Sequence, residues 1–287
     1  MTSRIIDMRL RPPIPEWTSG PTFRTAMHYA RKVPNFAGAR SAWTESMDEL
    51  FGEMDKTGVA IGVIMGRAAF GELGGVGNSA IVSALERWPE RFVGFLGVDL
   101  AHIGESLAEI KELARHKGVR GISIEPGSAQ TPMHSDDPAL DPIYDLCEEL
   151  GLPVSISLSG LLSALAGHDI SWASPIGVQR LAMRRPGLTI ILSHASWPWA
   201  EQAVCIALIC PNLYISPDIY IATRSMPGYR AYVDAANLYL EDRTLFGTAY
   251  PSRSLEDGVQ DFLTMGWRPE IIEKILWTNA ARLLGLQ

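Results

Sequence analysis

The feature that most constrains the fold is a regular alternation of short apolar segments with helix-like segments along nearly the whole chain of 287 residues. The apolar segments are rich in Val, Ile and Leu and have strand length, which is typical of buried parallel strands. Between them, apolar residues recur every three or four positions, as in amphipathic helices. The predicted strands cover residues 4–10, 59–65, 92–98, 119–124, 152–157, 188–193, 212–216 and 245–248.

Eight strands separated by helices in a chain of this length predict an α/β fold of the (β/α)8, or TIM-barrel, type. No linker interrupts the pattern, so we expect a single domain over residues 1–287. Residues 14–43 lack a clear period and are predicted to be a loop with short helical pieces, forming a lid or insertion after the first strand. The predicted helices cover residues 44–58, 78–88, 106–116, 142–150, 176–184, 198–208, 230–240, 256–265 and 269–276.

The composition of the chain limits the kinds of partner that the protein is expected to bind. Apolar residues make up 47% of the chain, enough to bury a full core. The formal net charge of −7 argues against nucleic acid, which requires clustered Lys and Arg. No apolar run approaches the roughly 20 residues of a membrane-spanning helix, and no signal-peptide pattern is present. We therefore predict a soluble cytoplasmic protein with no membrane contact. The three cysteines form no CxxC pair and are expected to be reduced.

Polar residues gather at the predicted strand ends. The sixth strand ends at His194, directly before the rigid Trp197–Pro198 turn. In a TIM barrel the carboxyl ends of all strands form one face, where catalytic groups collect. The strand-end residues expected to share one pocket are Arg9, Arg11, Arg67, Asp99, Glu125, Ser157, Ser159, His194, Asp218, Tyr220 and Tyr250.

These residue types suit acid–base chemistry on an anion. A histidine has an ordinary pKa of about 6.5, close to working pH, so His194 is the first candidate for proton transfer, with Asp218 and Glu125 as catalytic partners. Arginine offers a planar fork for a carboxylate. We assign substrate binding to Arg9, Arg11, Tyr220, Tyr250, Trp197 and Ser157, and predict a small anionic substrate.

Structural interpretations compete with these assignments. Asp7 and Glu125 fit ion pairs with Arg9 or Arg120, Arg67 and Asp99 fit a solvated rim, and the two tyrosines fit packing roles. A Ser157–His194–Asp218 nucleophilic relay is a further alternative, although no strained nucleophile elbow is visible. The loop containing His134, Asp136 and Asp137 has the composition of a metal cluster, but its pattern favours turn and helix-cap roles.

The chain resembles the amidohydrolase-related family, which includes aminocarboxymuconate-semialdehyde decarboxylase, aromatic acid decarboxylases and pyrone-dicarboxylate lactonase. The resemblance extends over nearly the whole chain and implies the same barrel. It is carried by Ile6-Asp7, Gly121-Ile122, Gly151-Leu152-Pro153-Val154, Ile191-Leu192-Ser193-His194-Ala195, Trp197-Pro198, Leu245-Phe246-Gly247-Thr248-Ala249-Tyr250-Pro251 and Asn279-Ala280-Ala281-Arg282-Leu283-Leu284-Gly285.

Most members of that family bind a divalent metal through an HxH pair on the first strand, a histidine on the fifth and an aspartate after the eighth. The matching positions are Met8, Leu10, Ser157 and Ala249, none of which is an ordinary ligand. The resemblance therefore predicts no metal and no cofactor. His194 matches the family's sixth-strand acid–base histidine. We expect Arg9, or Arg11 if its side chain reaches inward, to replace the charge of the cation.

Three functions remain open on the sequence alone. The first is a metal-independent hydrolase for a small carboxylate-bearing lactone or ring, with Asp218 or Glu125 taking over from the carboxylate that Ala249 lacks. The second is a non-oxidative decarboxylase (carboxy-lyase) in which His194 protonates the carbanion. The third is a catalytically inactive barrel that binds a small anion. The clustering of ionisable groups favours an enzyme. The family's tendency also predicts a homo-oligomer.

Overall fold

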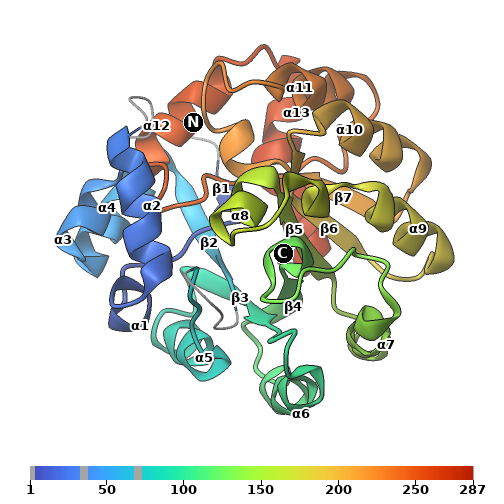
Figure 1. The fold of residues 1–287 in the computed structure, drawn as a ribbon. Coiled ribbons are helices and arrows are strands. Elements are labelled where there is room, and N and C mark those ends of the chain that lie inside the picture. Colours follow the sequence, from blue (N-terminus) through green and yellow to red (C-terminus); the bar gives the residue numbers. More distant parts are fainter. Residues whose placement is uncertain (1–3, 33–37, 68–72, 287) are drawn as a thin grey trace.

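The computed structural model describes residues 4–32, 38–67 and 73–286. Parallel strands form a seven-stranded sheet in the order of the chain, as expected when each strand is followed by a crossover helix. Figure 1 shows the helices arranged around the strands. The strands are β1 (Ile5–Asp7), β2 (Val59–Met65), β3 (Phe92–Gly97), β4 (Val119–Ile124), β5 (Val154–Ser159), β6 (Ile190–Trp197) and β7 (Leu213–Ser216).

The helices pack their apolar faces against the sheet. None of the described helices has the length and hydrophobicity of a membrane-spanning helix. The α-helices are α1 (Pro15–Thr18), α2 (Pro21–Lys32), α3 (Arg40–Thr44), α4 (Met47–Thr57), α5 (Asn78–Arg87), α6 (Ile103–Leu113), α7 (Asp141–Leu150), α8 (Gly160–Leu165), α9 (Ile176–Arg184), α10 (Ala200–Ile209), α11 (Tyr229–Leu238), α12 (Leu255–Leu263), α13 (Pro269–Glu273) and α14 (Asn279–Leu284). Short 3-10 turns are η1 (Pro126–Ser128), η2 (Pro138–Leu140), η3 (Ile170–Ala173) and η4 (Asp218–Tyr220), and η5 (Lys274–Thr278) is a π-helical turn.

Two sequence expectations are wrong in detail. Residues 245–248 do not form an eighth strand, although Leu245 N donates to Ile215 O and Met8 N donates to Phe246 O. The physical reason is that Thr248 N donates to the Asp7 carboxylate instead of a backbone carbonyl, and Ala249 adopts a left-handed conformation. Residues 14–43 are expected from the sequence to be a loop with short helical pieces; α1 and the start of α3 are such pieces, but α2 is a longer helix of 12 residues, and 33–37 lie outside the described residues.

The core has two layers because successive strand residues point to opposite faces of the sheet. One layer lies between the strands and the surrounding helices. In the other, alternate residues of β1, β2 and β3 pack against the C-terminal helix α14. That inner layer contains Ile6, Met8, Val63, Met65, Val93, Phe95, Ile191, Leu245, Ala280, Ala281 and Leu284. Apolar packing at one end of the strands leaves the other end for polar residues.

The close packing at that polar end can be tested by a substitution at Gly66. A Cβ atom at Gly66 would collide with backbone atoms of Phe95, Leu96 and Gly97, which cannot rotate away. We expect Gly66→Ala to lower the free energy of unfolding by about 2–3 kcal/mol, the upper range for overpacking. Gly104→Ala on α6 is the matched control, because nothing lies within 4 Å of its added Cβ. Equal urea denaturation midpoints for the two variants would contradict this packing.

Candidate active site

Arg9 and Arg11 follow β1 and carry their side chains to the polar end of the strands. Met8 and Leu10, which alternate with them, pack instead into the two apolar layers. Both arginines are buried. The structure therefore places two guanidinium groups among the strand-end polar residues, where the sequence comparison had matched Met8 and Leu10 to metal ligands. The side chains of both arginines therefore reach inward.

The Arg9 side chain contacts residues at the ends of three strands. Its Nε donates to Asp218 Oδ2 at 2.8 Å and its Nη2 donates to Ser157 Oγ at 2.6 Å. Its Nη1 lies 4.0 Å from Glu125 Oε1 and has no hydrogen-bond partner within the described part of the chain. The side chain is fully buried, so Arg9 holds the surrounding groups in place. Ser157, predicted to bind substrate, is likewise occupied with Arg9.

Glu125, at the end of β4, forms a buried two-pronged ion pair with Arg67, which follows β2. Arg67 Nε donates to Glu125 Oε2 at 2.7 Å and Arg67 Nη2 donates to Oε1 at 3.0 Å. Arg11 Nη2 lies 3.7 Å from the same carboxylate. Burial alone would raise the pKa of Glu125, but Arg67 and Arg11 outweigh it and hold that pKa below its ordinary value. Arg67 is thus a site residue, not a solvated rim residue.

His194 and Asp218 meet where β6 and β7 end. The His194 backbone N donates to Asp218 Oδ2 at 3.1 Å, and His194 Nδ1 lies 3.4 Å from that oxygen. Ser216 Oγ also donates to Asp218. Burial, followed by the positive charges of Arg9, Arg11 and Arg67, holds the pKa of His194 well below its ordinary value. The imidazole is therefore neutral at neutral pH and able to accept a proton.

The backbone at these strand ends is strained. His194, Ala195 and Ser196 have φ values of 60°, 42° and 56°, and Asp218 has a φ of 55°. A left-handed conformation costs a non-glycine residue roughly 1–2 kcal/mol. Such residues cluster where the surrounding structure must aim a functional side chain. Here the strained residues interrupt the regular pairing of β6 with β5 between Ser193 and Trp197, and the hydrogen bond from His194 N to Asp218 holds this stretch in place.

A small cavity of about 90 Å³ opens beside His194. Arg11 and Arg67 contribute charge to its wall, whereas Leu161, Leu162 and Leu165 of α8 contribute an apolar side. Arg11 Nε is buried, and no described residue forms a hydrogen bond with it. The cavity therefore combines a neutral base, an incompletely paired guanidinium and an apolar wall, which suits a compact anion.

Tyr220 lines this cavity, whereas Tyr250 and Trp197 belong to the packing around it. Tyr220 lines the cavity and shares a hydrogen bond of 2.6 Å with Ser159 Oγ. Trp197 stacks on Tyr220 with ring centroids 5.1 Å apart, so it supports the cavity wall from behind. The Tyr250 hydroxyl shares a hydrogen bond of 2.8 Å with Ser41 Oγ and is fully buried.

Sequence reasoning missed the leucines of α8 and Ser159's link to Tyr220. The leucine run follows β5 directly, and the Leu161-Leu162 spacing was a usable signal of a short helix. Asp7 also has a different partner from the one considered, because it accepts from the backbone N of Arg9 at 2.9 Å and from Thr248 Oγ1 at 2.6 Å. Burial raises the pKa of Asp7 to about 7.

The described residues do not fit a divalent cation. They contain no group of three or more His, Cys, Asp or Glu side chains that could hold a metal. The guanidinium of Arg9 contacts both Ser157 and Asp218, and it brings positive charge without a donor electron pair. In the acidic loop, Asp137 accepts from Ala139 N at 2.9 Å, which confirms its capping role, and Asp136 pairs with Arg180.

Comparison with known proteins assigns the family. A family model described as amidohydrolase matches residues 44–286, and the chain belongs to this family. An uncharacterized TIM-barrel protein from Bordetella bronchiseptica is 36% identical, with a TM-score of 0.88 and 99% of each chain covered. A 2,6-dihydroxybenzoate decarboxylase from Rhizobium is 18% identical, with a TM-score of 0.70 and 99% of each chain covered, and shares the fold.

Two further relatives carry names of different activities. A 2-amino-3-carboxymuconate-6-semialdehyde decarboxylase from Dictyostelium discoideum is 33% identical over 79 residues, which is 28% of this chain and 21% of that protein's length. A probable 2-pyrone-4,6-dicarboxylic acid hydrolase from Acinetobacter baumannii is 13% identical, with a TM-score of 0.64 over 99% of this chain and 100% of that chain. The proteins that this chain resembles in sequence or fold thus include some named as decarboxylases and one named as a hydrolase.

The Arg67–Glu125 pair provides a test of the buried charge network. Arg67→Met leaves Glu125 buried with only the more distant Arg9 and Arg11, and we expect it to lower the free energy of unfolding by about 3 kcal/mol. Adding Glu125→Gln should recover part of that loss. The control is Arg180→Met, whose partly exposed pair with Asp136 is expected to contribute less than about 1 kcal/mol. Similar losses in both single variants, measured by urea denaturation, would contradict the network.

The protonation of His194 is a second test. We expect its imidazole to titrate well below the ordinary pKa of 6.5, because burial and the neighbouring positive charges disfavour the protonated form. Protein labelled with [15N]histidine reports this directly by NMR, with His194→Gln identifying the signal. Arg11→Met should move the titration midpoint up toward the ordinary 6.5, since one repelling charge is removed. A wild-type midpoint at or above 6.5 would refute this electrostatic assignment.

Proposed function

We propose that this protein is a metal-independent hydrolase that opens a small carboxylate-bearing lactone, with His194 as general base. The observation that carries the proposal is a neutral, buried imidazole beside an incompletely paired guanidinium in one small cavity. Three buried arginines, Arg9, Arg11 and Arg67, face two carboxylates, Glu125 and Asp218, which leaves one positive charge for a substrate carboxylate.

The proposed reaction requires no external redox partner. His194 accepts a proton from water as the water oxygen bonds to the lactone carbonyl carbon. The ring C–O bond then breaks, and the leaving alkoxide takes that proton, so the product is a hydroxy acid. Arg11 holds the anionic substrate. Asp218 positions His194 through the backbone N and is itself fixed by Arg9.

We further propose that two segments complete the site. Thr25 of α2 lines the small cavity, which supports the assignment of residues 14–43 as a lid. The 244–250 segment hydrogen-bonds to both edge strands, β7 through Ile215 and the chain after β1 through Met8, which supports its role as the eighth member of a closed barrel.

Decarboxylation is the second candidate, favoured by the local match to the Dictyostelium decarboxylase. It requires a proton donor for the carbanion that remains when carbon dioxide departs. A neutral imidazole whose pKa is held low is a weak source of that proton. The geometry therefore supports hydrolysis better.

The experiment is an assay of small carboxylate-bearing lactones, including 2-pyrone-4,6-dicarboxylate, by acid release in a pH-stat, alongside carbon dioxide evolution. We expect hydrolysis that survives EDTA and follows no added metal. His194→Gln should lower kcat about 100-fold or more, the usual contribution of a general base. Arg11→Met should chiefly raise KM. The control is His134→Gln, because that exposed ring stacks on Trp172 away from the cavity.

Three outcomes would contradict the proposal. Loss of hydrolysis in EDTA with recovery on adding a divalent metal would refute metal independence. Full turnover in His194→Gln would remove the general base. Carbon dioxide release without lactone opening would transfer the assignment to decarboxylation.

A further inference from the structure

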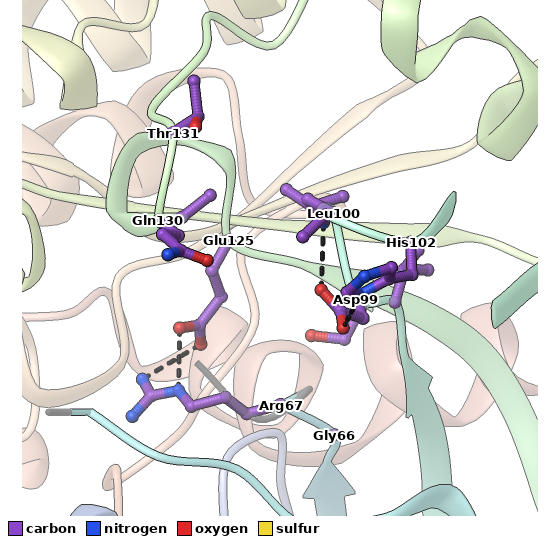
Figure 2. A pocket seen from close by; sticks show the side chains of 12 residues that line it. Gly66, Arg67, Asp99, Leu100, His102, Glu125, Gln130 and Thr131 are labelled. Atoms are coloured by element: carbon purple, nitrogen blue, oxygen red, sulfur yellow. Dashed lines mark hydrogen bonds and ion pairs between the residues drawn. The ribbon is translucent and has the colours of Figure 1, made fainter. Parts of the chain in front are cut away.

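A second and larger cavity, which we call the Ser123 cavity, lies on the other side of Arg67. Its volume is about 430 Å³, against about 90 Å³ beside His194. Arg67 lines both cavities, so the Arg67–Glu125 pair forms the wall between them. Figure 2 shows this pair on one side of the Ser123 cavity and Asp99 with His102 on the other. The proposed chemistry uses only the smaller cavity.

Ser123 supplies a polar atom that this structure leaves unused. Its side chain is 1% exposed and comes from β4, two residues before Glu125. Ser123 is one of the residues that line the cavity, and its buried Oγ has no hydrogen-bond partner among the residues that the structure describes. A buried hydroxyl without a partner costs free energy unless a ligand or water completes it. Ser123 therefore marks a place where a polar ligand atom is accommodated.

The charges of the Ser123 cavity are paired. Arg67 is bound to Glu125 by two hydrogen bonds, and His102 Nδ1 lies 3.0 Å from Asp99 Oδ2. The hydrogen bond and charge of Asp99 raise the pKa of His102. This cavity thus lacks the excess positive charge of the His194 cavity. It also offers both donors and acceptors, through the Ser123 hydroxyl and the Gln130 amide.

We propose that the Ser123 cavity binds a polyhydroxylated, uncharged group. Hydroxyls both donate and accept, so they match carboxylate oxygens on Glu125 and Asp99 together with the free Ser123 hydroxyl. This inference extends the proposed function by giving the substrate a hydroxylated portion in addition to its carboxylate. A separate polyol has the same chemistry, and the experiment distinguishes the two sources.

The experiment compares three six-carbon ligands by isothermal titration calorimetry. Gluconate carries one carboxylate and a hydroxylated chain, hexanoate carries the same carboxylate without hydroxyls, and sorbitol carries the hydroxyls without the carboxylate. We expect gluconate to bind at least tenfold more tightly than hexanoate. Ser123→Ala should weaken gluconate about three- to tenfold, the effect of one neutral hydrogen bond, and leave hexanoate unchanged.

Ser135→Ala is the matched control variant. Ser135 is also a buried serine whose hydroxyl has no partner, but it is not in the lining of the Ser123 cavity. Neither substitution removes a side-chain hydrogen bond seen in the described residues, so both variants are expected to fold normally. Unchanged gluconate affinity in Ser135→Ala, beside the loss in Ser123→Ala, would assign the effect to the cavity.

Arg11→Met identifies the source of the hydroxylated group. If that group belongs to the substrate, Arg11→Met weakens gluconate as well and sorbitol binds poorly. If a separate polyol is the ligand, sorbitol binds as well as gluconate, Arg11→Met changes neither, and the extension to the substrate is wrong. Equal affinity for gluconate and hexanoate, or no saturable gluconate binding, overturns the inference. Lactone turnover dependent on His194 would stand in either case, because it is measured separately.

Discussion

The site depends on one constraint: five charged side chains are buried together at the strand ends and must compensate one another. Arg9, Arg11 and Arg67 face Glu125 and Asp218 at distances between 2.7 and 4.0 Å. Removing a single partner from such a network leaves an unpaired buried charge, which is more costly than the pair is stabilising. The same imbalance of charge keeps His194 neutral and favours an anionic ligand.

Backbone geometry and side-chain chemistry support each other at this end of the molecule. The left-handed residues His194, Ala195 and Ser196 interrupt the regular pairing of β6 at a cost, and Asp218, itself left-handed, accepts the His194 backbone N–H that holds this stretch in place. Asp7 plays a similar part across the fold by accepting from the backbone N of Arg9 and of Thr248. The carboxylates of Asp7 and Asp218 thus accept hydrogen bonds from backbone N–H groups near the candidate site.

The buried arginines of this member of the amidohydrolase family differ in their electrostatics from a bound cation. A bound cation concentrates charge at a point with open coordination positions, whereas a guanidinium distributes charge over a plane and directs its hydrogen bonds. Arg9 donates hydrogen bonds to Ser157 and Asp218, so it holds these strand ends together. Arg11 is less fully paired, because its buried Nε and Nη2 have no hydrogen-bond partner among the residues that the structure describes.

The sequence by itself determined the alternation of strands and helices, the family, and the set of polar residues at the strand ends, because hydrophobic period and strand-end position are local properties. It could not determine that Thr248 would pair with Asp7 instead of extending an eighth strand, or that residues 21–32 would form one helix. Nor could it decide that Arg67 would be buried against Glu125, that Arg9 would hydrogen-bond to Ser157 and Asp218, or that Trp197 would stack on Tyr220. These outcomes rest on contacts between residues far apart in the chain, and only the tertiary structure sets those distances.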